Sequence, residues 1–139
     1  MMDNAKYDKI YNILEYEVDP SWKKYVTEEY KEYRKKWAKA SRGFIFKFPL
    51  CIEIESSYYC NLRCPMCARQ ALGIFNEGGL IDRKLYSKIL DEAKRYRMPA
   101  IMLDHEAEPL INHHIANMVK EAKEAGVLDI WIHTNGCGI

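Results

Sequence analysis

From residue 50 onward, the chain alternates short apolar runs with amphipathic stretches. Three runs rich in apolar residues predict β-strands, over residues 50–55, 100–104 and 128–134. The two segments between them place apolar residues three or four positions apart, which is the spacing of one helix face. Strands that alternate with helices predict an α/β fold with a parallel sheet and right-handed crossovers.

Capping residues mark the ends of both predicted helices. Asp82 is a good N-cap for a helix that runs to about Arg97. Asn112 is the corresponding cap of the next helix, and Gly126 suits its C-terminal end because glycine readily adopts left-handed backbone angles. The expected buried faces are Leu85, Ile89, Leu90, Ala93 and Tyr96 in the first helix, and Ile115, Met118, Val119 and Ala122 in the second.

Residues 1–42 form a polar, aromatic-rich segment that we expect to be helical. Asp19-Pro20-Ser21 interrupts this segment, because proline ends one helix and serine can cap the next. In the second helix one stripe is aromatic and apolar, and we expect it to pack against the domain that follows; its members are Trp22, Val26, Tyr30, Tyr33 and Trp37. The opposite face is charged, which is more typical of a solvated surface than of a nucleic-acid site.

Polar residues follow each predicted strand. A group of cysteines comes after the first strand, the stretch Glu106-Ala107-Glu108-Pro109 after the second, and Thr134-Asn135-Gly136 after the third. Ligand sites of parallel sheets lie at the carboxyl ends of the strands. These three stretches are therefore expected to meet on one rim of the sheet.

The cysteine stretch Cys60-Asn61-Leu62-Arg63-Cys64-Pro65-Met66-Cys67 places three thiols on one short loop. Thiolates bind soft metals, so this spacing suits an iron–sulfur cluster or part of a zinc site. In a 4Fe-4S cluster, three cysteines leave one iron for a distant residue or a small molecule. If Cys137 or a histidine supplied the fourth ligand, the chain would be a non-catalytic zinc- or iron–sulfur-binding module.

This loop, placed directly after an apolar strand, resembles the cluster loop of the radical S-adenosylmethionine (SAM) enzymes. In that family three cysteines hold three irons of a 4Fe-4S cluster, and SAM chelates the fourth. The resemblance implies that Cys60, Cys64 and Cys67 are the metal ligands. It also implies an enzyme that cleaves SAM reductively to methionine and a 5′-deoxyadenosyl radical, which then abstracts hydrogen from a substrate.

The resemblance further implies a set of SAM-binding residues. Glu108 and the backbone near it would receive the SAM amino group, Thr134 and Asn135 would lie beside the methionine moiety, and Met66 would pack on adenine. The full expected set is Met66, Glu106, Ala107, Glu108, Pro109, Thr134 and Asn135. His105 and Ala107 stand where glycines are common in the family.

The fold that the resemblance implies is a partial TIM-like barrel in residues 43–139, preceded by the helical extension of residues 1–42. About three of the family's six βα units would be present, so we expect the chain to be a fragment of a longer protein and inactive alone. An electron donor such as flavodoxin or ferredoxin is implied. Asn61-Leu62-Arg63 and Pro65 are similar to the branch that modifies peptides and carries a C-terminal auxiliary-cluster (SPASM-type) domain, although a small-molecule substrate remains an alternative.

Composition and charge bear on the partners and the cellular compartment of the protein. The net charge of +1 over 139 residues gives no indication of nucleic-acid or membrane binding, and no apolar run approaches the roughly 20 residues that span a bilayer. The N-terminus has no apolar signal-peptide core. We therefore expect the reducing cytoplasm, where clustered cysteines are metal ligands more often than disulfides. Arg63 and Arg69 flank the expected cluster and could moderate its negative charge, although most such arginines are solvated.

Overall fold

A computed structural model describes residues 24–74 and 78–137. Its elements are α2 (Glu28–Ala40), β1 (Cys51–Glu53), α3 (Ala68–Leu72), α4 (Arg83–Tyr96), β2 (Ala100–Met102), the 3₁₀ helix η2 (Pro109–Ile111), α5 (Ile115–Glu124) and β3 (Asp129–Trp131). The strands form one parallel sheet in the order β1-β2-β3. The predicted α/β class and parallel sheet are thus confirmed, whereas closure into a barrel is not seen among the described residues.

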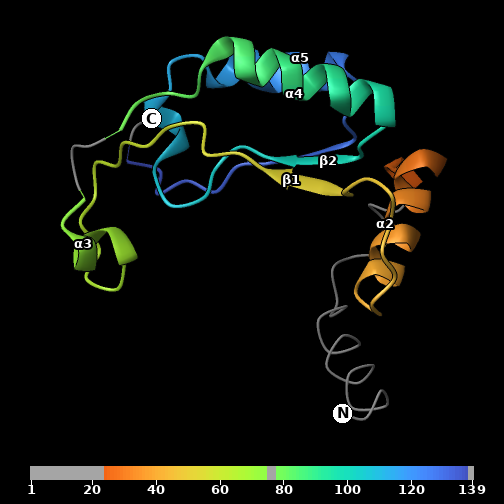
Figure 1. The fold of residues 1–139 in the computed structure, drawn as a ribbon, viewed down its shortest axis with the longest axis horizontal. Helices are drawn as coiled ribbons and strands as arrows, with labels where there is room; N and C mark the ends of the chain where they lie inside the picture. Colours follow the sequence, from red (N-terminus) through yellow and green to blue (C-terminus); the bar gives the residue numbers. More distant parts are fainter. Residues whose placement is uncertain (1–23, 75–77, 138–139) are drawn as a thin grey trace.

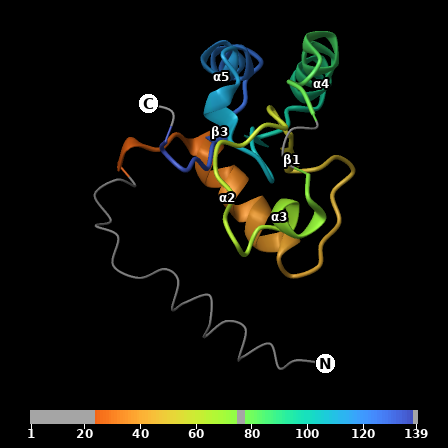
Figure 2. The ribbon, with the colours of Figure 1, turned by 90° about the vertical axis from the view of Figure 1, so that its left-hand side faces the viewer.

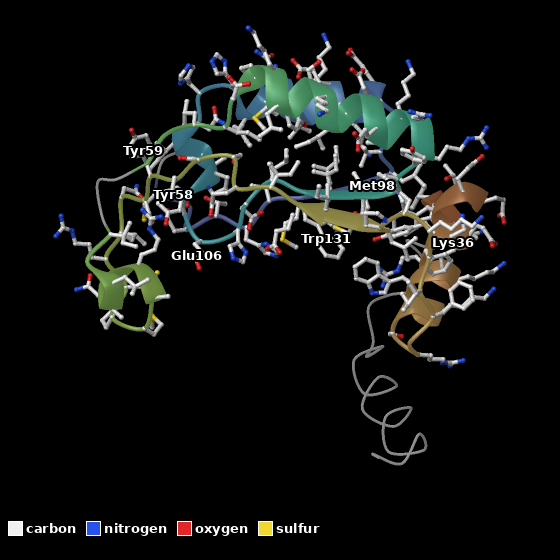
Figure 3. The ribbon with its side chains drawn as sticks, viewed as in Figure 1. Lys36, Tyr58, Tyr59, Met98, Glu106 and Trp131 are labelled. Atoms are coloured by element: carbon white, nitrogen blue, oxygen red, sulfur yellow. The ribbon has the colours of Figure 1, made fainter. Side chains whose placement is uncertain are left out.

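The two faces of the sheet have different partners because successive side chains of a strand point to opposite faces. Ile52, Ile101 and Ile130 stand in register and pack in one apolar cluster with residues of α4 and α5. These two helices lie over that face (Figure 1) and run side by side (Figure 2). Trp131 lies on the other face (Figure 3), so the residues that alternate with the isoleucines face away from α4 and α5.

Helix α4 begins as predicted, since the Asp82 side chain accepts a hydrogen bond from the backbone N–H of Leu85 at 2.8 Å. Its predicted buried face is partly wrong. Leu85 is 51% exposed and Tyr96 is also exposed, whereas Tyr86, which was not expected in the core, is fully buried. The Tyr86 hydroxyl donates to the carbonyl of Met118 at 2.7 Å, so it ties α4 to α5.

Helix α5 has the predicted apolar face, with Met118 and Ala122 buried, but its start differs. Its N-cap is His114, and Asn112 instead accepts from the His114 N–H and donates to the carbonyl of Ser56. Gly126 follows the helix with a φ of 91°, which confirms it as the C-terminal glycine.

The N-terminal helix α2 starts later than the sequence suggested. Thr27 caps it, while Trp22 and the expected break at residues 19–21 lie outside the described residues, as does the first predicted helix. The aromatic stripe nevertheless packs inward. Tyr33 is buried, and the rings of Trp37 and Trp131 are 5.9 Å apart. Helix α2 therefore lies on the side of the sheet opposite α4 and α5 (Figure 2).

Candidate metal and cofactor site

The three loops predicted to converge are bonded to one another in pairs. The backbone N–H of Glu108 donates to the carbonyl of Tyr59 at 2.9 Å, which joins the loop after β2 to the start of the cysteine loop. The Asn135 side chain donates to Asn61 Oδ1 at 2.9 Å, which joins the loop after β3 to the same cysteine loop. The predicted convergence on one rim is confirmed, at the end of the molecule opposite α2 (Figure 1).

The third pair of loops, those that follow β2 and β3, is joined through the side chain of Glu108. Its carboxylate accepts hydrogen bonds from Thr134 Oγ1 at 2.7 Å, from the Asn135 N–H at 2.8 Å and from the Leu110 N–H at 2.9 Å. Burial by itself would raise the pKa of Glu108, but the hydrogen bonds from Asn135, Leu110 and Thr134 outweigh it and hold the pKa below its ordinary value. Glu108 is therefore a buried, ionised connector between β2 and β3.

These loops enclose a cavity of about 350 Å³, a size typical of small-molecule sites. Eight of the ten predicted site residues line it: Cys60, Cys64, Cys67, Glu106, Ala107, Glu108, Thr134 and Asn135. Met66 and Pro109 do not. Met66 is 86% exposed, and Pro109 is buried at the start of η2. Figure 3 shows Glu106 at the end of the sheet that faces α3.

The three loop cysteines are free and half-buried. Cys67 is the N-cap of α3, a short helix that directly follows the cysteine loop. Among the described residues, no three His, Cys, Asp or Glu side chains are placed to hold one metal ion. A four-iron cluster is wider than one ion, and each of its cysteines binds a different iron. Three reduced thiols around one cavity therefore fit the donor set of such a cluster.

Cys137 and Cys51 do not line this cavity. Cys137 is exposed, although its backbone is close to the loop, since its carbonyl accepts from Asn61 Nδ2 at 3.3 Å. Cys51 is half-buried in β1, where burial raises the pKa of its thiol.

Asp104 and His133 form a bonded pair in the cavity wall that the sequence did not single out. Asp104 is buried, and its oxygens accept from the His133 backbone N–H at 2.8 Å and face His133 Nδ1 at 2.9 Å. Asp104 and His133 each lie two positions after the last residue of β2 or β3. Each directly follows a residue of the apolar cluster, Leu103 or Ile132, so alternation alone places them on the face that carries Trp131. Which two of many polar residues would pair could not be read from the sequence.

A second histidine, His105, follows Asp104 in the sequence and also lines the cavity. His105 Nδ1 is 2.8 Å from Glu53 Oε1, and its Nε2 is 3.8 Å from Glu106 Oε1. The hydrogen bond to Glu53 raises the pKa of His105, and the charges of Glu53, Glu106 and Glu55 act in the same direction. Glu106 is held from its backbone, because its N–H donates to Glu55 Oε2 at 2.8 Å.

Arg69 departs from expectation most clearly. A solvated arginine was predicted, yet Arg69 is 3% exposed and lines the cavity beside Cys67. Its Nη2 donates to the Tyr58 carbonyl at 2.7 Å. Asn61, which bridges two loops, was quoted in the motif but given no such role. For both Asn61 and Arg69, the signal available in the sequence was a polar residue within two positions of a predicted cysteine ligand.

Comparison with known proteins identifies the family. The family described as "4Fe-4S single cluster domain" matches residues 57–137. The chain belongs to this family. The match begins shortly after β1 and includes all three loops of the cavity, so the matched segment contains the structural site.

One curated relative is the tungsten-containing aldehyde ferredoxin oxidoreductase cofactor-modifying protein of Pyrococcus furiosus, which is 38% identical over 88 residues. The match covers 63% of this chain and 23% of that relative, so the chain spans less than a quarter of the relative's length. Two solved structures share the fold. BtrN in complex with AdoMet and 2-DOIA has a TM-score of 0.61 at 24% identity, over 68% of this chain and 39% of BtrN. BtrN in an open conformation has a TM-score of 0.59 at 23% identity, over 68% and 42%.

Within residues 24–74 and 78–137, no helix combines the length and apolar character needed to cross a bilayer.

Proposed function

We propose that the chain is the cluster-binding part of a radical SAM enzyme. The observation that supports this most directly is that the thiols of Cys60, Cys64 and Cys67 line one cavity together with the loops that follow β2 and β3. Three cysteines leave one iron of a 4Fe-4S cluster for a small molecule. The fold shared with BtrN, whose complex contains AdoMet, supports SAM as that molecule.

The chain's own residues suit the two ends of SAM. A carboxylate has about four acceptor positions, and Glu108 uses three of them within the protein. One position remains for the SAM ammonium group, so Glu108 would both hold the Thr134–Asn135 turn and contact the cofactor. Glu106 lines the same cavity with an exposed carboxylate and would serve as a second acceptor. Met66 would reach adenine only if the exposed loop turned it inward.

When bound and reduced, the cluster would supply one electron that cleaves SAM to methionine and a 5′-deoxyadenosyl radical. The electron would come from a flavodoxin or ferredoxin in a reducing cytoplasm. Residues 43–139 would form the first half of the core domain, and residues 1–42 an extension that packs through Trp37 on β3. The substrate class that we favour is a peptide, by the resemblance of Asn61-Leu62-Arg63 and Pro65 to the SPASM-type branch.

The test is anaerobic reconstitution of the full-length gene product with iron and sulfide, followed by metal analysis and visible absorbance. We expect about four irons and four sulfides per chain. Cys64→Ala should abolish the cluster, while Cys137→Ala and Cys51→Ala, which remove thiols outside the cavity, should retain it.

The zinc module is the alternative that this experiment separates. A colourless protein with one zinc, lost in Cys137→Ala, would exclude the radical SAM proposal. A second assay incubates the reconstituted protein with SAM and dithionite and measures 5′-deoxyadenosine. A four-iron protein that forms none would retain the cluster assignment and lose the SAM-cleavage assignment.

A further inference from the structure

The guanidinium of Arg69 is held rigidly against the cysteine loop. Arg69 lies two residues after Cys67, in α3, and is 3% exposed. One of its terminal nitrogens, Nη2, donates to the Tyr58 carbonyl at 2.7 Å. Its central carbon is 4.2 Å from the centre of the Tyr58 ring, which places the cation on an aromatic face. Tyr58 therefore fixes the guanidinium from one side and leaves the other nitrogen to a different partner.

That other nitrogen, Nη1, is buried and has no hydrogen-bond partner among the described residues. A buried cationic donor without an acceptor is unfavourable. Because Arg69 lines the cavity, a group bound in the cavity could supply the missing acceptor. The two buried carboxylates of the cavity are already engaged, and the third, Glu106, lies 3.8 Å from His105 Nε2. Glu108 accepts three hydrogen bonds, and Asp104 is bonded to His133. The protein groups around the cavity thus leave room for an anion at Arg69.

We propose that Arg69 Nη1 donates a hydrogen bond to a sulfur of the bound cluster, either a sulfide or a coordinating thiolate. This inference rests on the proposed function, because it needs a cluster at Cys60, Cys64 and Cys67. A cluster held by three thiolates is anionic, and it gains one more negative charge when it accepts an electron. A buried cation that donates to its sulfur stabilises the reduced form most, since net charge and hydrogen bonds to sulfur set the reduction potential.

The experiment measures the midpoint potential of the reconstituted full-length protein by electron paramagnetic resonance, without SAM. Arg69→Gln removes the charge, and we expect the equilibrium constant for one-electron reduction of the cluster to fall about tenfold. This corresponds to a midpoint potential about 59 mV more negative than that of the wild type. Arg69→Lys keeps the charge but loses the planar fork, so its potential should lie between those of the wild type and Arg69→Gln. It also serves as the second variant if Arg69→Gln fails to fold, which circular dichroism reports.

Arg83→Gln is the matched control. Arg83 also lies over a tyrosine ring and also has a buried Nη1 without a partner among the described residues, but it pairs with Glu121 and does not line the cavity. The midpoint potential of the cluster in Arg83→Gln should equal that of the wild type. Equal potentials in the wild type and in each Arg69 variant that assembles a cluster would overturn the inference, even if such a variant bound SAM carboxylate more weakly. A wild-type protein without a four-iron cluster would instead overturn the proposed function.

Discussion

Asp104 holds His133 at two points, because one carboxylate oxygen accepts from the His133 backbone N–H and the other lies 2.9 Å from His133 Nδ1. The two residues are 29 positions apart and follow neighbouring strands. Since a carboxylate only accepts, His133 Nδ1 is the donor to Asp104. The pair thus joins the ends of β2 and β3 and presents a defined imidazole at the cavity.

Removal of the Asp104 carboxylate should destabilise the fold more than removal of the His133 ring. Asp104→Ala leaves the His133 N–H without its acceptor in a partly buried position, and we expect a loss of about 1–3 kcal/mol. His133→Ala keeps that backbone bond and removes a side chain that is 72% exposed, so the loss should stay near 0.5 kcal/mol. Chemical denaturation of both variants measures the difference. Equal losses would mean that the backbone bond contributes little.

Glu108 should make the stability of the protein depend on acid pH. Its pKa in the folded state lies below the ordinary value of 4.5, so the unfolded chain binds a proton at a pH where the folded protein does not. The contribution is complete above about pH 4.5 and is lost as the pH falls through the lower, folded value. Glu108→Gln should cost about 2 kcal/mol at pH 7, because hydrogen bonds to a charged acceptor are weakened, and should flatten the acid dependence.

Denaturation series from pH 7 to pH 3 measure this dependence. Glu92→Gln, on the exposed surface of α4, changes the same formal charge and should keep the acid slope of the wild type. A Glu108→Gln variant with an unchanged slope would show that Glu108 is not the group that titrates.

His105 should titrate above its ordinary pKa of 6.5. The hydrogen bond that His105 donates to Glu53 is the main cause, and the charges of Glu53, Glu106 and Glu55 add to it. Glu53→Gln removes both the charge and the carboxylate acceptor, so the pKa of His105 should move down toward 6.5. Nuclear magnetic resonance of the imidazole protons follows the titration directly. A His105 pKa that did not respond to Glu53→Gln would contradict the contact.

Gly78 should tolerate no side chain. Its φ is 145°, and a Cβ at this position would overlap the Tyr58 side chain. Gly78→Ala should therefore cost about 2 kcal/mol or more, from backbone strain and displacement of the ring that supports Arg69. The neighbouring Gly79 has open space around it and no left-handed φ, so Gly79→Ala should change stability by less than about 0.5 kcal/mol. Thermal unfolding of the two variants, which differ by one position, tests the assignment.

The helices and strands could largely be predicted because their signals are local. Asp82 caps α4 through a residue three positions away, and Gly126 ends α5 by its own backbone freedom. Errors arose where the decisive contact was distant. Leu85 and Tyr96 have the helical spacing of core residues, but the packing of α4 against α5 buries Tyr86 instead, with its hydroxyl on the carbonyl of Met118.

By itself, the sequence determined the cysteine spacing, the βα order and the meeting of three loops at one rim, since parallel strands bring their carboxyl ends to one edge. Only the tertiary structure decided what those loops do to one another. The bonds of Glu108 to Thr134 and of Asp104 to His133 join residues 26 and 29 positions apart, and no local pattern selects one polar partner among several. The burial of Arg69 was likewise decided by Tyr58 folding over it, because burial depends on what packs around a side chain and not on its own chemistry.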